Sequence, residues 1–318
     1  GPYVQSERLT IYKKYSDELI QKGSAYHCFC SAERLEKLRE TQQKNKQPTG
    51  YDQFCLKNVN SEAALQRVVA GERHVVRLKM PKEGQTVFND LIRGEIKFKN
   101  ILVDDQVLIK SDGFPTYHLA VVVDDHLMQI THVIRGDEWI SSTPKHIQLY
   151  KCFGWKAPEF AHLPLLLNAD KSKLSKRQGD VAVSEYQKNG YLPEALINFV
   201  AFLGWNPGDE REIFSLQELI KEFNISKVNK TGAIFNVDKL NWFNKEYIKK
   251  LSVSELAEKS LSWFGDGVDL KKLERMISLE RERVTTLAEL PGALAFAFTL
   301  PDYTADQLGW RKGAGEEV

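Results

Sequence analysis

The feature that most constrains the fold is the segment 111–139, in which two apolar blocks are separated by a polar break. Residues 119–123 are continuously apolar and follow a helix-like stretch, whereas residues 130–134 are rich in β-branched side chains. The second block is typical of an inner strand of a parallel sheet. Because open α/β sheets place ligands at the carboxyl ends of their strands, we expect a binding site just after this block, at Arg135 and Glu138.

Arg135 is the side chain that this position singles out. A guanidinium without a partner at the end of a strand suits a carboxylate held by two parallel hydrogen bonds. We therefore expect Arg135 to bind the side-chain carboxylate or the α-carboxylate of a substrate.

A second stretch, residues 163–180, is an apolar run that ends in a cationic loop. Residues 165–167 are predicted to form a short buried strand. Four cations and two hydroxyls suit the oxygens of a polyphosphate, although charge alone also fits a solvated basic loop. These residues are Lys171, Lys173, Lys176, Arg177, Ser172 and Ser175.

The sequence from Lys173 to Arg177, Lys-Leu-Ser-Lys-Arg, resembles the Lys-Met-Ser-Lys-Ser signature of class I aminoacyl-tRNA synthetases. Segments 111–139 and 232–247 resemble glutamyl-tRNA synthetases of the bacterial and mitochondrial type, and this resemblance covers residues 1 to about 248. It implies an α/β fold, in which a partial Rossmann-type catalytic domain carries an inserted α+β acceptor-binding subdomain and is followed by an all-α C-terminal region.

The resemblance also implies domain limits. They are 1–30 with 116–170 for the catalytic domain, 31–115 for the acceptor-binding subdomain, 171–252 for the lysine loop and stem-contact helices, and 253–318 for the start of a helical anticodon-binding domain. The family's His-x-Gly-His motif occurs nowhere in the 318 residues. We therefore expect a chain truncated at both ends, which binds the tRNA acceptor arm weakly and neither exchanges pyrophosphate nor charges tRNA.

The family joins L-glutamate to ATP, releases pyrophosphate and passes the glutamyl group to tRNA(Glu), with Mg²⁺ as the accompanying ion. Carried over to this sequence, Tyr117 and Arg135 contact glutamate, and Lys173 and Lys176 are catalytic. Val121 stands where some members have an Asn near the amino acid. The residues implied to bind ATP are Glu138, Trp139, Lys173, Ser175 and Lys176.

Cysteines offer a metal site that the resemblance makes doubtful. Cys28, Cys30 and Cys55 would supply three of the four ligands of zinc, as in the insertion of some bacterial members. Those members have a His two residues after the last Cys, where this chain has Lys57. Tyr51 or His27 would have to substitute, and we expect no structural zinc. Four cysteines in 318 residues are no disulfide framework and suggest a reducing compartment.

The overall composition does not indicate which partners the chain binds. The net charge is +1, so binding of tRNA must rely on local basic patches. No apolar run approaches the length of a membrane span, and we expect no membrane partner. We expect a monomer in the mitochondrial matrix, with the cytoplasm as the alternative.

Periodicity predicts helices over 6–22, 32–44, 143–153, 193–205, 256–263 and 270–279, with Thr143 as a helix N-cap. Alternation over 73–110 predicts one small antiparallel sheet, whose basic residues contact tRNA phosphates or are merely its solvated face. The basic residues of this sheet are Arg73, Arg77, Lys79, Arg93, Lys97 and Lys99.

The sequence also contains three histidines close to one another. His118, His126 and His132 are expected on a helix, a turn and a strand, so they are too far apart to form a metal site.

Two other functions stay open. One is a glutamyl-queuosine tRNA(Asp) synthetase-like paralogue, which needs no anticodon-binding domain. The other is a non-catalytic tRNA-binding fragment or regulatory isoform, which the missing His-x-Gly-His motif favours.

Overall fold

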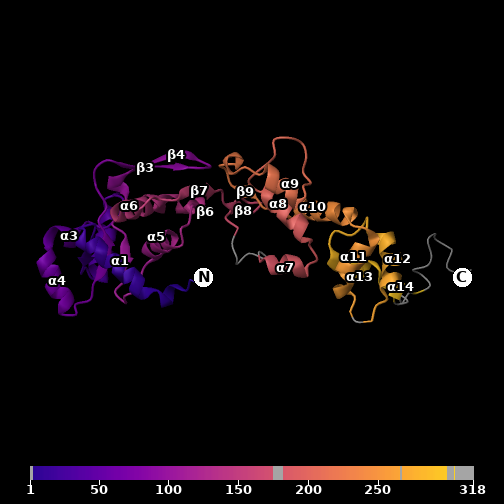
Figure 1. The fold of residues 1–318 in the computed structure, drawn as a ribbon, viewed down its shortest axis with the longest axis horizontal. Helices are drawn as coiled ribbons and strands as arrows, with labels where there is room; N and C mark the ends of the chain where they lie inside the picture. Colours follow the sequence, from indigo (N-terminus) through magenta and orange to yellow (C-terminus); the bar gives the residue numbers. More distant parts are fainter. Residues whose placement is uncertain (1–2, 175–181, 266, 299–303, 305–318) are drawn as a thin grey trace, which may run out of the picture. The chain divides into compact units, whose positions relative to one another are not determined.

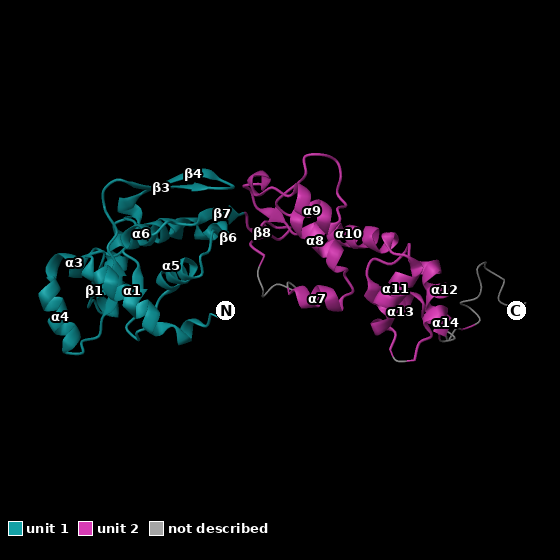
Figure 2. Ribbon diagram, in the orientation of Figure 1, with its two compact units in different colours: residues 1–163 teal, residues 164–318 magenta. Residues whose placement is uncertain are grey.

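The computed structural model describes residues 3–174, 182–265, 267–298 and 304, and the chain divides into two compact units. Unit 1 comprises residues 1–163 and unit 2 residues 164–318 (Figures 1 and 2). Each unit has a hydrophobic core of its own. Among the described residues, no helix has the length and apolar character needed to cross a bilayer.

Unit 1 mixes helices with two sheets. Its elements in chain order are η1 (Gln5–Glu7), α1 (Leu9–Gln21), β1 (Ala25–Cys28), α2 (Ala32–Lys44), α3 (Phe54–Asn58), α4 (Ser61–Val69), β2 (Val75–Leu78), β3 (Gln85–Asp90), β4 (Gly94–Lys99), η2 (Asn100–Leu102), β5 (Val107–Ile109), α5 (Tyr117–Leu127), β6 (His132–Gly136), η3 (Asp137–Ser142), α6 (Thr143–Phe153) and β7 (Glu159–Leu163).

The sheets of unit 1 correct the prediction of one antiparallel sheet over 73–110. β2 and β5 join β1 in a three-stranded antiparallel sheet, whereas β3 and β4 extend the parallel pair β7–β6 in the order β4-β3-β7-β6. The β3–β4 hairpin reaches β7 through one parallel pairing, Asp90 with Phe160. Alternation specifies that a segment is extended but not which strand becomes its neighbour, so it could not separate the two sheets.

The core of unit 1 lies where α1, α5 and α6 pack against the first sheet, and Figure 1 shows the three helices near one another. Tyr12 of α1 and Leu119 of α5 are fully buried there. Burying a side chain of this size contributes roughly 1.5–3 kcal/mol. Hydrogen bonds also join α5 to the α1 region: Asp124 of α5 accepts from the Tyr12 hydroxyl at 2.7 Å and from Arg8 at 3.0 Å.

Residues 119–123 form part of helix α5, and the β-branched block that follows enters strand β6. β6 pairs with β7 in parallel and is the last strand of the described sheet, so it is not the inner strand that its composition predicts. Ile134 accordingly exposes 54% of its surface. The predicted helices are otherwise present, and α2 begins where Ser31 accepts a hydrogen bond from the Arg34 amide.

Unit 2 is mostly helical. Its elements are β8 (Leu166–Leu167), α7 (Val183–Lys188), α8 (Pro193–Phe202), α9 (Leu216–Glu222), η4 (Ile225–Lys227), β9 (Ala233–Ile234), α10 (Val237–Lys250), α11 (Val253–Ser260), η5 (Leu261–Trp263), α12 (Leu270–Glu280), η6 (Leu287–Glu289), α13 (Leu290–Ala293) and α14 (Ala295–Phe298). The strand predicted over 165–167 is a two-residue parallel partner of β9, and Leu166 is exposed, so the strand is not buried.

Candidate substrate-binding site

The parallel pairing of β6 with β7 places Arg135 beside His162, its register partner. Arg135 is the penultimate residue of β6, and η3 with α6 begins directly afterwards. The strand therefore ends where two short helical segments bring polar side chains over it. The position agrees with the prediction that Arg135 lies at the carboxyl end of a parallel strand.

The Arg135 guanidinium is held by three neutral acceptors. Its Nε–H donates to His162 Nε2 at 3.2 Å, one terminal nitrogen donates to Thr143 Oγ1 at 2.8 Å, and the other lies 3.3 Å from His146 Nδ1. Among the described residues, Arg135 forms no ion pair with a carboxylate. Burial lowers the pKa of Arg135, and the nearby Tyr117 hydroxyl opposes this effect.

The surrounding histidines are neutral at pH 7. Burial, followed by the charge of Arg135, lowers the pKa of His146 well below its usual value. The pKa of His118, whose Nδ1 lies 3.0 Å from His146 Nε2, is lowered to about 4, chiefly by burial. In the described part of the chain, no carboxylate is thus bonded to Arg135 itself, because Asp90, the carboxylate behind it, reaches the guanidinium only through the neutral imidazole of His162. A cation bonded only to neutral groups is the electrostatic setting of a site for an anion.

Aromatic rings lie over the same guanidinium. Tyr117, the first residue of α5, packs on Trp139 of η3 with ring centroids 4.6 Å apart, and Arg135 lies 5.7 Å from the Trp139 ring. Tyr117 remains 41% exposed, so one side of this group faces solvent. The structure thereby brings Tyr117 and Arg135 together. Trp139, predicted to border ATP, lies beside these two residues.

Glu138, the other predicted ATP neighbour in η3, is exposed. Its carboxylate lies close over Gly136, where an added Cβ would approach Glu138 Oε2 to 2.2 Å. A glycine at this point therefore lets the acidic side chain fold back over the end of β6.

Four members of this network were not predicted. Asp90, Thr143, His146 and His162 are all buried and contact Arg135 directly or through one neighbour. Thr143 was predicted to cap α6, but the helix begins at Thr143 itself, and its hydroxyl donates to Trp139 O and accepts from Arg135. The available signal for Asp90 was the alternation of β3, in which Thr86, Phe88 and Asp90 are buried and their neighbours are exposed. His162 follows two buried apolar residues of β7, so a polar side chain there needs a buried partner.

The other predicted histidines do not join a site. His126 stacks on Trp155 with centroids 3.7 Å apart, and His132 Nδ1 contacts Thr131 Oγ1 at 2.9 Å. His118 is the one of the three that belongs to the Arg135 network. The three histidines therefore lie in separate environments, as their spacing in the sequence predicts.

The lysine loop belongs to unit 2 and is described in part. Lys173 pairs across the loop with Leu167, and the Leu174 amide donates to Leu166 O at 2.9 Å. Lys171 has a positive φ of 66°, and the Asn168 amide donates to Ser172 O at 2.8 Å, so the chain turns tightly here. Ser175, Lys176 and Arg177 lie outside the described residues.

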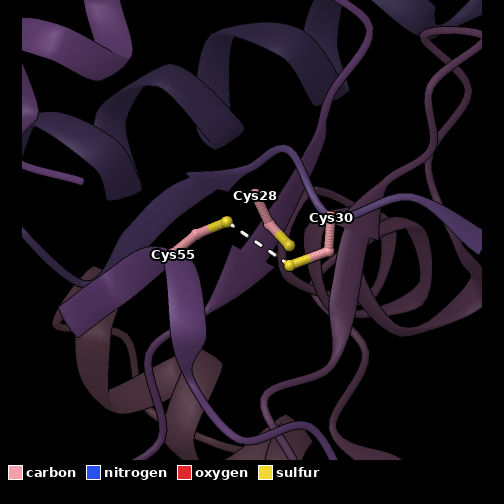
Figure 3. Close-up of side chains that lie close together, drawn as sticks. All are labelled: Cys28, Cys30 and Cys55. Carbon is pink, nitrogen blue, oxygen red and sulfur yellow. Dashed lines mark hydrogen bonds between the residues drawn. The ribbon is translucent and has the colours of Figure 1, made fainter. Parts of the chain in front are cut away.

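Figure 3 shows the three cysteines whose sulfur atoms converge. The Sγ atoms of Cys28, Cys30 and Cys55 all lie within 4.8 Å of one another, and the Cys30–Cys55 separation is 3.5 Å. The Tyr51 hydroxyl lies 3.3 Å from Cys28 Sγ and accepts the Cys55 amide at 2.9 Å. Hydrogen bonding from Cys55 lowers the pKa of the Cys28 thiol.

This donor set is one ligand short of a closed zinc site. Three thiols can supply three tetrahedral positions, but burial raises the pKa of Tyr51, so the residue nearest the fourth position is a neutral phenol. Lys57 donates to Asp52 O at 3.0 Å, and His27 packs on His74. The expectation of no structural zinc stays a prediction.

Two of the basic residues predicted to meet tRNA phosphates are engaged inside the protein. Arg77 is buried, donates to Asp105 O at 2.9 Å and stacks 4.1 Å from the Tyr51 ring centroid. Arg93 pairs with Asp137 at 2.7 Å and donates to His162 O. Arg73, Lys79, Lys97 and Lys99 are exposed.

Comparisons with known proteins agree with this architecture. The family model described as "tRNA synthetases class I (E and Q), catalytic domain" matches residues 1–242, and the chain belongs to this family. A glutamate–tRNA ligase of Alkaliphilus metalliredigens is 47% identical over an alignment 299 residues long, and this alignment covers 91% of this chain and 60% of that protein. The glutamate–tRNA ligase of Fusobacterium nucleatum is 48% identical over an alignment 320 residues long, and this alignment covers 96% of this chain and 62% of that protein.

Comparison with a solved structure also identifies a glutamate tRNA ligase as similar to this chain. The glutamate tRNA ligase from Elizabethkingia meningosepticum, crystallised in complex with its amino acid, superimposes with a TM-score of 0.85 at 37% identity, covering 98% of this chain and 68% of that one. The fold is therefore that of a class I synthetase catalytic domain with mixed sheets. The chain spans 60% and 62% of the length of the two curated relatives.

Proposed function

We propose that this chain is the substrate-activating part of a glutamate–tRNA ligase. The observation that carries the proposal is Arg135, a partly buried cation whose three bonded acceptors are all neutral. A buried charge without an opposite charge is costly, and a substrate carboxylate would relieve that cost. The names of the curated relatives support L-glutamate as that substrate.

In this proposal Arg135 pairs with the side-chain carboxylate of glutamate, and the Tyr117 hydroxyl borders the same group. The α-carboxylate then attacks the α-phosphorus of ATP: an oxygen–phosphorus bond forms, pyrophosphate leaves with the bonding electrons, and glutamyl-adenylate results. In the second step the terminal ribose hydroxyl of tRNA(Glu) attacks the adenylate carbonyl: a carbon–oxygen ester bond forms, the bond from the carbonyl carbon to the phosphate oxygen breaks, AMP leaves with the bonding electrons, and the hydroxyl proton is released. Mg²⁺ bound to ATP would offset phosphate charge.

The lysine loop would act on the leaving group. Lys173 and Lys176 supply mobile charges that can follow pyrophosphate as negative charge develops on it, and Ser175 supplies a donor. Glu138 and Trp139 are proposed to border ATP. The exposed basic residues Arg73, Lys79, Lys97 and Lys99 are proposed contacts to the tRNA backbone.

We further propose that the protein acts as a monomer. Its location in the mitochondrial matrix, or alternatively in the cytoplasm, also stays a proposal. The curated relatives named above are bacterial proteins.

A chimaera tests the proposed function. These 318 residues would replace the matching part of the Fusobacterium nucleatum ligase, and charging of tRNA with labelled glutamate would be measured. We expect glutamate-dependent, ATP-dependent charging that falls at least about a hundredfold in Lys173→Ala, as for the loss of a charge that stabilises a transition state. Lys221→Ala, an exposed lysine of α9, is the control and should keep full activity. A folded chimaera that binds tRNA but charges no glutamate would refute the proposal.

A further inference from the structure

A buried acid–histidine pair lies behind Arg135. Asp90, the last residue of β3, accepts a hydrogen bond of 2.6 Å from His162 Nδ1, and both side chains are fully shielded from solvent. Nothing in the proposed reaction uses either group chemically. The question is therefore what a buried carboxylate and imidazole contribute beside a substrate-binding guanidinium.

The groups around the Asp90 carboxylate are all hydrogen-bond donors, so Asp90 acts only as an acceptor. Its Oδ1 accepts the backbone N–H groups of Ile92 at 3.0 Å and Arg93 at 2.9 Å, and its Oδ2 accepts the backbone N–H of His162 at 3.1 Å. A carboxylate fixed by three amides must take the proton of His162 Nδ1 as a fourth donor. This assignment makes Nδ1 the protonated nitrogen of His162.

The other ring nitrogen of His162, Nε2, must then accept a hydrogen bond. Burial lowers the pKa of His162 despite the hydrogen bond to Asp90, so the imidazole is neutral at pH 7 and its Nε2 carries a lone pair. Arg135 Nε, 3.2 Å away, cannot lose its proton and donates to that lone pair. Thr143 Oγ1 also lies 3.1 Å from Nε2, so the opposite tautomer would turn an N–H of His162 toward this oxygen but would also place it against the N–H of Arg135.

We propose that Asp90 and His162 are positioning residues that fix the orientation of Arg135 for the carboxylate of the substrate. Asp90 selects the imidazole tautomer, and His162 Nε2 together with Thr143 Oγ1 holds one edge of the guanidinium. The inference rests on the proposed function, because it treats Arg135 as the glutamate-binding residue. Fixing the side chain beforehand lowers the entropy cost of binding.

Asp90→Asn is the informative variant because an amide must point its NH₂ group at a donor. Turned toward Ile92 and Arg93, the NH₂ group would oppose two backbone N–H groups; turned toward His162, it opposes one backbone N–H. The second orientation is less costly, and it drives the imidazole to the Nε2–H tautomer. We therefore expect the variant to fold while it reverses the hydrogen bonding of His162.

The first test reads the tautomer directly in the 318-residue chain. Nitrogen-15 NMR of the imidazole rings, with the His162 signals assigned by their loss in His162→Gln, should show an Nδ1–H tautomer at about pH 7. In Asp90→Asn the proton should move to Nε2. An Nε2–H or doubly protonated His162 in the unmodified chain would overturn the inference.

The second test separates positioning from general stability. Calorimetric titration with L-glutamate should show about tenfold weaker affinity in Asp90→Asn and in His162→Leu. His162→Gln, whose amide oxygen can accept from Arg135, should recover most of the loss. His126→Gln, at a histidine outside the network, should bind as the unmodified chain does.

A double-mutant cycle completes the test. In an Arg135→Gln background, Asp90→Asn should cause no further loss of glutamate affinity, whereas an equal loss in both backgrounds would overturn the inference. Circular dichroism confirms that each variant is folded. If the unmodified chain binds no glutamate, the proposed function fails for this chain, and the tautomer measurement alone decides whether Asp90 sets the imidazole.

Discussion

At the scale of the residue, the sequence predicted Arg135 and Tyr117 of the candidate site but not the side chains that hydrogen-bond to Arg135. Arg135 could be predicted because it follows a β-branched block, and Tyr117 because it occurs in a stretch resembling a known family. Asp90 and His162 are 72 positions apart and meet only because β3 and β7 pair. Each residue's buried position can be read locally, but which residue becomes its partner depends on strand pairing and cannot be read from a single sequence.

The cysteine cluster gives a prediction about metal. We expect the chain, purified without added metal, to contain less than one equivalent of zinc, because the described residues near the three thiols offer a neutral phenol and no fourth strong ligand. Elemental analysis measures the content. One tightly held equivalent that is lost in Cys55→Ser and kept in Cys152→Ser, a cysteine outside the cluster, would show this expectation to be wrong.

Asp125 of α5 gives a prediction about pH. Burial, with a smaller contribution from the charge of Asp124, raises the pKa of Asp125 to about 6. The folded state thus binds more protons than the unfolded state between about pH 4 and 6, so the stability present below about pH 4 is lost as pH rises through about 6.

Asp125→Asn should therefore raise the free energy of unfolding by roughly 1–3 kcal/mol at about pH 7 and change it little at about pH 4. Urea unfolding at both pH values measures the difference. Asp17→Asn, at an exposed pair with Lys13 on α1, should give a change of less than about 1 kcal/mol. An equal effect of Asp125→Asn at both pH values would show that the charge of this carboxylate is not what costs stability.

At the scale of the element, helices were predicted better than sheets. The helix over 32–44 needs only its own sequence, with Ser31 as N-cap, whereas the strands over 73–110 needed knowledge of distant partners. The same reason explains β6: β-branched residues favour an extended chain, but they do not determine whether a strand lies inside a sheet or at its edge.

Gly190, which follows α7, gives a prediction about the contact between the end of this helix and residues 287–288. Its φ is +79°, and a Cβ would meet the Ala288 amide nitrogen at 2.4 Å, where the Leu287 amide donates to Gly190 O. Gly190→Ala should lower the free energy of unfolding by more than about 2 kcal/mol, because a backbone clash adds to left-handed strain of about 1 kcal/mol.

Gly208→Ala is the matched control in the same unit, since its φ is +96° but no atom lies within 4 Å of the added Cβ. Gly208→Ala should lower the free energy of unfolding only by the cost of left-handed backbone strain, about 1 kcal/mol. Denaturant unfolding of both variants measures the difference. Equal destabilisation of both would mean that the contact between Gly190 and the residue 287–288 segment is not a tight constraint.

At the scale of the whole molecule, the Arg135 network is complete within unit 1. β3, α5, β6, η3, α6 and β7 supply all of its members, and each of these elements belongs to residues 1–163. The lysine loop belongs to unit 2, and its residues 175–181 lie outside the described part of the chain. The described side chains that surround the proposed position of the glutamate side-chain carboxylate thus all lie in one unit.

Calorimetric titration of the chain with L-glutamate and with L-glutamine, repeated in Arg135→Gln, tests the proposed role of Arg135. The two ligands differ in the group that Arg135 is proposed to bind. We expect glutamate to bind at least about tenfold more tightly than glutamine, because a charge-assisted pair contributes roughly 1.5–3 kcal/mol, and we expect Arg135→Gln to remove that difference. Equal affinities in the unmodified chain, or an undiminished preference for glutamate in Arg135→Gln, would contradict this role.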